Sequence, residues 1–545
     1  MGEIRQVMFM GDEALNLNFA PQSNSAMKRF RFLLLFAVVP FLLGADACNK
    51  KSNDAVQSTE TETVETPLPG DALALAPRMG GNVQSAFIKR RKLNGRWFYT
   101  YPAMEDLNLT MTRGLSGTGA TYSRYGDASR DPAYRGMGWA KSAAEHPNHE
   151  RPQQIQKRDR NEPENHYKSW MDMCVATDMR DVVLVANMYM PFSELEDLIG
   201  DMEAKGINIL WIEADNEQNS PQHQRGLLAS LKEKDPNTSR YGPEELARKY
   251  FAQYWDWVEE LEAFCEARNL PVSYVGTPVI YAFPNDLPDA VTGGRKIGKK
   301  KSTTDRVFNE SGAERVRRGK LEGAAISRHR YRQWLHKDGV MYDRNDDLRK
   351  KLSYPLARNY YDDLMRTEVQ FYRSMYPGAQ ILLTEWGLKS RPNGPGYSWA
   401  QAQDVAKFLL ATAKINAELR EQAIPVVTYQ SLYGEKMFGL MYFEGNQVGL
   451  APEGRAMSLF SVMDGAPILE VGNGDDVKTQ WIRVEKDGQQ YLCYYNLENR
   501  SMSIPYSGSA EFMQATDLFD ETNTTKTQPV SGTVPPNSIG VVTLN

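Results

Sequence analysis

Cysteine and histidine are scarce in this chain, which limits the chemistry that it can support. Its 545 residues include four cysteines and six histidines, scattered without the spacing typical of zinc ligands. We therefore expect no metal site and no cofactor. Cys174, Cys265 and Cys493 stand in apolar stretches, which predicts buried thiols, with one incidental disulfide as the alternative.

An excess of charge of one sign is also missing. The chain carries 64 basic and 69 acidic residues, a net charge of −5 at pH 7. Proteins that bind nucleic acid present a basic surface to the phosphates, so this balance argues against such a partner. Apolar residues make up 41% of the chain and aromatic residues 10%, which is enough for a large core and excludes global disorder.

Long apolar runs are confined to the N-terminus. Residues 27–31 are basic, residues 32–43 are apolar, and Ala45, Ala47 and Cys48 follow. The run is too short to cross a bilayer, so residues 27–48 are interpreted as a secretory signal preceded by an upstream extension at residues 1–26. Cys48 resembles the lipidated cysteine of bacterial lipoproteins, although Asp46 and Ala47 depart from that motif, and ordinary cleavage before Cys48 is the alternative.

The next segment, residues 49–76, is rich in Ser, Thr and Glu and is predicted to be a disordered tether. These features predict an exported protein of the cell envelope. An outer-membrane lipoprotein held by a lipid anchor is the first expectation, and a periplasmic or secreted protein is the alternative. No obligate protein partner is evident.

From residue 77 onward, apolar strands alternate with amphipathic helices, which is typical of an α/β fold with a parallel sheet. Eight strands are expected, at residues 79–84, 109–114, 181–189, 209–215, 272–281, 323–331, 381–385 and 424–429. Residues 77–460 are therefore predicted to form a (β/α)8 TIM barrel. Short alternating strands separated by Gly, Asn, Asp and Pro then predict an antiparallel β-sandwich at residues 461–545.

Two of these strands end in carboxylates. Residues 209–215 lead into Asn216 and Glu217, and residues 381–384 lead into Glu385, Trp386 and Gly387. In a barrel, the C-terminal ends of the strands build the active site. A pair of carboxyl groups there suits glycosidic bond cleavage, because one protonates the leaving oxygen and the other attacks or stabilises the anomeric carbon.

The Asn-Glu pair and the later Thr-Glu-Trp-Gly motif resemble the fourth and seventh strands of the large clan of retaining (β/α)8 glycoside hydrolases. The closest similarity is to its α-L-arabinofuranosidase, β-xylosidase and heparanase-like members, which add a β-sandwich after the barrel. This resemblance implies Glu217 as acid/base, Asn216 as a partner of the sugar 2-hydroxyl, and Glu385 as nucleophile. The structural alternatives are a solvated loop acid for Glu217 and a structural ion pair for Glu385.

The same resemblance suggests further substrate-binding residues around the two carboxyl groups. Arg113 resembles the arginine beneath the nucleophile, where its charge would favour the ionised carboxylate. In the clan, an aromatic residue on the sixth strand hydrogen-bonds the nucleophile, and Tyr331 matches it better than His329, whose alternative is a structural role. Asn187 is a candidate sugar contact at the end of the third strand.

Two aromatic residues complete the predicted site. Trp386 is expected to offer a platform for the apolar face of a sugar ring. Many relatives carry a tryptophan on the eighth strand, where this chain has Tyr429. That departure concerns the substrate specificity rather than the reaction.

A basic segment lies between the fifth and sixth predicted strands, at residues 293–301, with further Arg and Lys residues up to Lys320. It is either a solvated insertion or a clamp for an anionic, sulfated or uronic polysaccharide. The sequence thus predicts a retaining glycosidase that acts on a polysaccharide or oligosaccharide. The alternatives are a non-catalytic glycan-binding lipoprotein and a transglycosylase.

Overall fold

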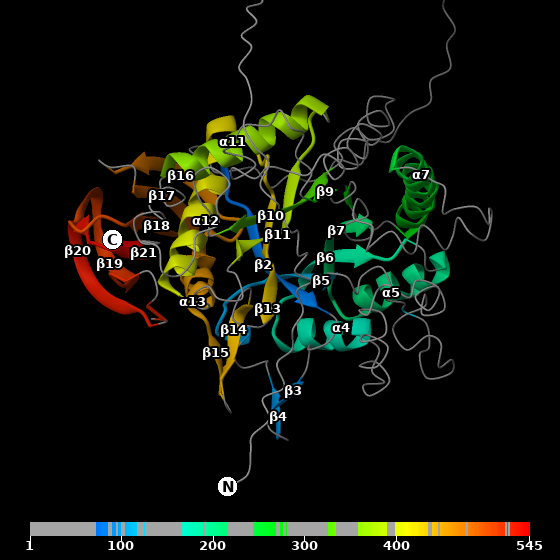
Figure 1. Ribbon diagram of the computed structural model, residues 1–545, viewed down its shortest axis with the longest axis horizontal. Coiled ribbons are helices and arrows are strands. Elements are labelled where there is room, and N and C mark those ends of the chain that lie inside the picture. Colours follow the sequence, from blue (N-terminus) through cyan, green and yellow to red (C-terminus); the bar gives the residue numbers. More distant parts are fainter. Residues whose placement is uncertain are drawn as a thin grey trace, which may run out of the picture. The chain divides into compact units, whose positions relative to one another are not determined.

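The computed structural model describes most of the predicted barrel and the C-terminal region (Figure 1). The described residues are 72–84, 90–93, 96–99, 104–116, 125, 166–188, 191–214, 243–268, 273–275, 279–280, 325–333, 358–375, 377–389, 398–433, 439–444, 447–474, 478–517, 520–521 and 524–545. Residues 66–545 form one compact unit. The predicted signal with Cys48, the Asn216–Glu217 pair and the basic segment lie outside the described residues.

A parallel sheet carries the predicted barrel strands. Its order is β8-β7-β6-β5-β2-β12-β11-β10-β9. The strands are β2 (Arg78–Gln84), β5 (Met111–Ser116), β6 (Asp181–Ala186), β7 (Asn208–Ala214), β8 (Ser273–Val275), β9 (Val279–Ile280), β10 (Ile326–Gln333), β11 (Ile381–Lys389) and β12 (Val426–Tyr429). The predicted order of strands one to four and six to eight is confirmed.

The fifth predicted strand, residues 272–281, is described in two parts. Ser273–Val275 form β8 beside β7, and Val279–Ile280 form β9 beside β10. Residues 276–278 lie outside the described ranges, so the continuity of this strand stays a prediction.

Helices follow the strands in the sequence as an α/β fold requires. They are α4 (His166–Ala176), α5 (Phe192–Ala204), α7 (Pro243–Arg268), α11 (Arg358–Met375) and α12 (Trp399–Leu419). Figure 1 shows them arranged around the parallel sheet. Within β6, Val182 to Ala186 are all buried, which is typical of a parallel strand covered on both faces.

Helix α12 is buried nearly all round. It contacts β11 of the parallel sheet and also the strands of the C-terminal sheet. It therefore packs between the two sheets, with polar residues such as Asp404 and Lys407 buried beside its apolar ones. Asn416 fixes its end, because its side-chain amide donates to the carbonyls of Leu75 and Ile424, at 3.0 and 2.9 Å, and accepts from the Ile424 amide at 2.8 Å.

The C-terminal region forms a seven-stranded antiparallel sheet with the order β1-β16-β17-β18-β21-β19-β20. Its strands are β1 (Ala74–Leu75), β16 (Pro467–Asn473), β17 (Thr479–Lys486), β18 (Gln489–Asn496), β19 (Met502–Gln514), β20 (Lys526–Val534) and β21 (Ser538–Leu544). Alternate residues of its strands enter two different apolar clusters. The sheet therefore buries both of its faces.

Strand β1 corrects one predicted boundary. The tether was expected to run through residue 76, but Ala74 and Leu75 pair antiparallel with β16, and Ala74 and Ala76 are buried. The reason is that this short apolar stretch gains both ladder hydrogen bonds and burial against the C-terminal sheet.

Smaller elements complete the described fold. The hairpin β3 (Arg90–Leu93) and β4 (Arg96–Tyr99) follows β2, while β13 (Ser431–Tyr433), β14 (Gly439–Glu444) and β15 (Gln447–Leu450) form a three-stranded sheet after β12. Helix α13 (Pro452–Leu459) and the 3-10 turn η4 (Phe460–Met463) then lead to β16. Gly81 lets β13 approach β2, because a Cβ there would lie 2.3 Å from the Leu432 side chain.

The three cysteines of the folded region, Cys174, Cys265 and Cys493, are free and buried. The expectation of buried thiols is confirmed, and none of these three forms a disulfide with another. No helix within the described ranges is both long enough and apolar enough to cross a bilayer.

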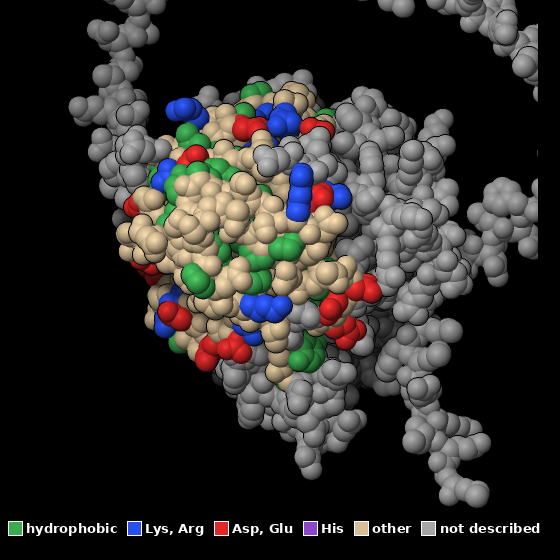
Figure 2. Space-filling view, turned by 90° about the vertical axis from the view of Figure 1, so that its left-hand side faces the viewer, with side chains coloured by type: hydrophobic (Ala, Val, Ile, Leu, Met, Phe, Trp, Pro, Cys, Tyr) green, Lys and Arg blue, Asp and Glu red, His purple; other side chains and the backbone are tan. Residues whose placement is uncertain are grey.

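Figure 2 shows one side of the molecule, with apolar side chains scattered singly among polar ones and charged residues near the margins. The C-terminal sheet lies on this side, and its edge strand β20 carries Lys526 and Pro529 among exposed polar residues. Charge and proline on an edge strand discourage pairing with another chain.

Candidate active site

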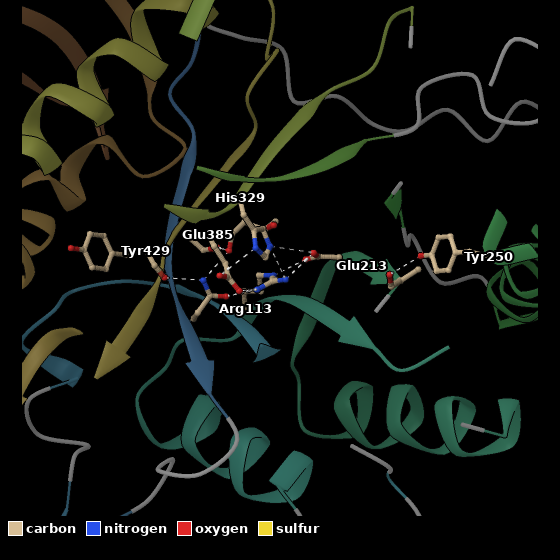
Figure 3. A network of polar contacts seen from close by, with 10 residues as sticks. Arg113, Glu213, Tyr250, His329, Glu385 and Tyr429 are labelled. Atoms are coloured by element: carbon tan, nitrogen blue, oxygen red, sulfur yellow. Dashed lines mark hydrogen bonds and ion pairs between the residues drawn. The ribbon is translucent and has the colours of Figure 1, made fainter. Parts of the chain in front are cut away.

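Five strands bring polar side chains together inside the parallel sheet. These residues are Asn82 on β2, Arg113 on β5, Glu213 on β7, His329 on β10 and Glu385 on β11. Asn82 pairs with Arg113 in the sheet register, and His329 pairs with Glu385. Figure 3 shows the side chains of the last four pointing toward one another.

The cluster is deeply buried, and the Glu385 side chain is slightly more exposed than the other members. Asn82, Arg113 and Glu213 are 0% exposed and His329 is 1% exposed, whereas Glu385 is 5% exposed. Burying charged side chains is costly unless they are paired. Glu385 is therefore the least buried member of this cluster.

Arg113 is the centre of the cluster. Its Nε and Nη2 donate to the two oxygens of Glu213, at 2.6 and 2.8 Å, in a bidentate pair. Its Nη1 donates to Glu385 Oε1 at 2.9 Å and to Asn82 Oδ1 at 2.9 Å. Burial lowers the pKa of Arg113, but Glu213 and Glu385 outweigh it and raise the pKa, so the guanidinium stays charged.

Glu213 is ionised for the same reason. Burial alone would raise its pKa, but the charge of Arg113 and the two hydrogen bonds from Arg113 outweigh burial and hold the pKa below its ordinary value. Glu213 is thus a fixed negative charge within the sheet, and its two oxygens are both directed at Arg113.

His329 lies between the two carboxyl groups. Its Nδ1 is 3.3 Å from Glu385 Oε2, and its Nε2 is 3.8 Å from Glu213 Oε1. Arg113 Nη2 lies 3.4 Å from the same Nε2. Both oxygens of Glu385 therefore have a nitrogen partner, Arg113 on one side and His329 on the other.

Asn82 joins three strands beneath the cluster. Its Nδ2 donates to the backbone carbonyls of Thr384 and Tyr429, at 2.8 and 2.9 Å, while its Oδ1 accepts from Arg113. These bonds link β2 to β11 and β12 directly beside Glu385. The position of the Glu385 backbone is therefore tied to the position of the Arg113 guanidinium.

The sixth strand supplies one described contact to Glu385. The register pairs His329 with Glu385 and Tyr331 with Gly387, and the imidazole of His329 contacts Glu385. The side chain of Tyr331, the preferred match, lies outside the described set, so its role stays a prediction. Residues 329 and 331 share a face of the strand, so alternation alone does not choose between them.

Trp386 and Tyr429 have a different position from the one expected. Trp386 is 0% exposed and stacks on Phe408 of α12, with ring centroids 4.1 Å apart. Tyr429 is 1% exposed and meets Trp386 edge to face, and Figure 3 shows its ring directed away from Glu385. Both rings pack in the core, so the expected sugar-platform role of Trp386 has no support in this arrangement.

The structure gives less detail on the other predicted site residues. Asn187 directly follows β6, and its side chain is buried. Asn216 and Glu217 follow β7 in the sequence but lie outside the described ranges, so their roles stay predictions. The hydroxyl of Tyr250 in α7 donates to the carbonyl of Ala214 at 3.3 Å, which anchors the end of β7 before them (Figure 3).

Sequence reasoning missed Asn82 and Glu213 as members of the site. A signal for Glu213 was present, because a carboxylate within the apolar strand 208–214 must have a partner if it is buried. Asn82 stands near the end of the first strand, level with Arg113. No group of three or more metal-ligating side chains occurs among the described residues.

Comparison of the fold with solved structures gives a consistent result. An α-L-arabinofuranosidase from Thermotoga maritima has a TM-score of 0.54 at 12% identity and covers 86% of this chain and 96% of its own. A family 51 arabinofuranosidase from Xanthomonas axonopodis pv. citri has a TM-score of 0.50 at 10% identity, with coverage of 88% and 96%.

A third structure, a family 51 α-L-arabinofuranosidase from Bifidobacterium longum, has a TM-score of 0.50 at 14% identity and covers 87% of this chain and 97% of its own. No family model and no curated protein matches the sequence. The resemblance predicted from the two strand-end motifs is confirmed at the level of the fold. This chain shares its fold with glycoside hydrolases of the arabinofuranosidase type.

Proposed function

We propose that this protein is a retaining glycoside hydrolase, with Glu385 as nucleophile and Glu217 as acid/base. The observation that carries the proposal is the setting of Glu385, whose two carboxyl oxygens meet Arg113 Nη1 at 2.9 Å and His329 Nδ1 at 3.3 Å. A cationic donor and an imidazole on opposite oxygens fix the orientation of the carboxyl group. A nucleophile must be oriented toward the carbon that it attacks.

The proposal includes a closed (β/α)8 barrel and a C-terminal β-sandwich. The edges of the parallel sheet, β8 and β9, belong to one short stretch of chain, residues 273–280, which supports closure. The antiparallel sheet buries an apolar cluster on each face, which supports a sandwich. In such a barrel, Glu217 follows the fourth strand and Glu385 lies on the seventh.

The reaction has two steps. Glu385 attacks the anomeric carbon while Glu217 gives its proton to the leaving oxygen, so the glycosidic bond breaks and a glycosyl ester forms on Glu385. Glu217 then removes a proton from water, the water oxygen attacks the same carbon, and the ester bond breaks. Glu385 leaves as a carboxylate, and Arg113 and His329 stabilise the returning charge.

The substrate we propose is a polysaccharide or oligosaccharide. The basic segment at residues 293–320 favours an anionic chain, sulfated or uronic, because Lys and Arg side chains bind such groups. For its location, we propose an exported lipoprotein anchored through Cys48, and periplasmic or secreted protein as the alternative if Cys48 is not lipidated.

The test is a screen of the purified protein against arabinans, xylans, and sulfated and uronic polysaccharides, together with aryl α-L-arabinofuranosides, because two fold neighbours are α-L-arabinofuranosidases. Glu385→Gln is compared with Glu368→Gln, which alters a buried carboxylate that pairs with Arg328 away from the cluster.

We expect reducing ends from the wild type and from Glu368→Gln, with none from Glu385→Gln. Binding of a glycan without cleavage by every protein would refute the hydrolase and support a glycan-binding lipoprotein. Transfer of the sugar to an added sugar acceptor in place of water would identify a transglycosylase.

A further inference from the structure

We propose that Glu213 is a positioning residue for the reaction. By holding Arg113 in one orientation, it places Nη1 against Glu385 and makes Nη2 select the tautomer of His329 that donates to Glu385. This inference rests on the proposed function for its kinetic consequences, but the tautomer itself can be measured without a substrate.

The first step of the argument is the way in which Glu213 fixes the guanidinium. Its two oxygens accept from Arg113 Nε at 2.6 Å and from Nη2 at 2.8 Å. A planar guanidinium bound at these two nitrogens cannot rotate about its long axis. Nη1 is then directed to Glu385 and Asn82, both at 2.9 Å.

The second step concerns His329. Nη2 carries a second N–H, and His329 Nε2 lies 3.4 Å from it. A proton on Nε2 would face this N–H, and Glu213 Oε1, at 3.8 Å, lies beyond hydrogen-bond distance of Nε2. The favourable arrangement therefore leaves Nε2 bare as an acceptor. The imidazole proton is then on Nδ1, which lies 3.3 Å from Glu385 Oε2 and can donate to it.

The third step excludes a direct role for Glu213 in the reaction. Its side chain is 0% exposed, and its oxygens are occupied by Arg113. Glu213 therefore acts through Arg113 and His329, while Glu385 keeps the residual exposure. Glu213 also balances the charge of Arg113, so the guanidinium is shared between two carboxylates rather than bound to Glu385 alone.

The test uses Glu213→Gln and Glu213→Asp in the full chain. Glutamine keeps the shape but loses the charge and one acceptor oxygen, and aspartate keeps the charge but is too short for the bidentate contact. Glu368→Gln is the matched control, because Glu368 pairs with the buried Arg328 on β10, the strand that carries His329. Circular dichroism and thermal unfolding identify the variants that fold.

The first readout is the His329 tautomer, from long-range 1H–15N correlation spectra of protein labelled in histidine. The His329 signals are identified by their loss in His329→Gln. We expect a proton on Nδ1 and a bare Nε2 in the wild type and in Glu368→Gln. We expect a mixture of tautomers in whichever Glu213 variant folds. An unchanged tautomer in a folded Glu213 variant would overturn the proposal, and so would a proton on Nε2 in the neutral wild type.

The second readout is kinetic and uses any glycoside that the wild type cleaves. We expect a loss of about 100-fold in kcat, the size typical of misplaced reacting groups, with KM nearly unchanged. Combining Glu213→Gln with Arg113→Lys should cost little more than either change alone, whereas Glu368→Gln with Arg113→Lys should be additive. Additive losses for the first pair would overturn the coupling.

The proposed function and the positioning role of Glu213 can be refuted independently of each other. If the wild type cleaves no glycoside, the proposed function fails, and the spectra still decide whether Glu213 sets the tautomer of His329. If the wild type is active and the Glu213 variants keep their kcat, the positioning role fails and the hydrolase stands.

Discussion

Replacing Arg113 with methionine is the most informative single change in this protein. The guanidinium lies between Glu213 and Glu385, with side chains that are 0%, 0% and 7% exposed. Methionine fills similar space but leaves two buried carboxyl groups without their cation. Breaking a buried ion pair by removing one partner costs about 3–5 kcal/mol. We expect a loss of this size in the free energy of unfolding at pH 7.

The pH dependence of that loss gives a sharper test. In the wild type, the pKa of Glu213 lies below its ordinary value because the charge of Arg113 and its hydrogen bonds outweigh the effect of burial. Its stabilising contribution is therefore present above the unfolded pKa, about 4.3, and is lost as the pH falls through the folded pKa. Without Arg113, burial dominates and raises the pKa of Glu213, so the variant folds best when Glu213 is protonated.

The stability difference between Arg113→Met and the wild type should consequently be largest near neutral pH and shrink toward pH 4. Urea denaturation followed by circular dichroism at several pH values measures it. Arg328→Met is the control, since it breaks the buried pair with Glu368. It should lower stability and leave kcat intact, whereas Arg113→Met should lose hydrolysis. A difference that grows on acidification would refute the reasoning.

Three further changes test the surrounding structure. Asp464→Asn should lower the free energy of unfolding by about 1–3 kcal/mol in urea denaturation, because Asp464 accepts from the Met79 amide at 2.8 Å and from Thr110 at 2.6 Å. Asn416→Ala should cost a similar amount and speed amide exchange at Ile424, whose N–H it accepts at 2.8 Å. Burial raises the pKa of Glu453 well above its ordinary range despite a backbone hydrogen bond, so wild-type stability should fall as pH rises above about 4.3. Glu453→Gln should flatten that fall in pH-dependent thermal unfolding.

The strand order could be predicted because each parallel strand is a short apolar run followed by a helix. Residues 181–189 and 381–385 are clear cases. Their expected first residues match those of β6 and β11, whereas β6 ends at Ala186 and β11 continues to Lys389. The two residues of β1 were missed because so short a strand depends on the sheet that receives it.

Register explains where the prediction of the site succeeded and failed. Arg113 and Glu385 were expected to meet and do so at 2.9 Å. His329 and Tyr331 have the same parity on β10, and the pairing of β10 with β11 sets His329 level with Glu385. Trp386 was assigned to the sugar although it follows Glu385 directly. Successive residues of a strand face opposite sides, and that rule alone places Trp386 toward α12.

The energetic cost of burying these ionic groups indicates that they are kept for function rather than for stability. Arg113, Glu213 and His329 are at most 1% exposed, and buried ionic groups can often be replaced by apolar residues of similar volume with no loss of stability. A scaffold that only needed to fold would gain little from an arginine shared between two carboxylates. The arrangement does serve one carboxyl that retains exposure, Glu385, by supplying a donor to each of its oxygens. Strongly perturbed, paired charges that converge on a single accessible group are typical of active sites.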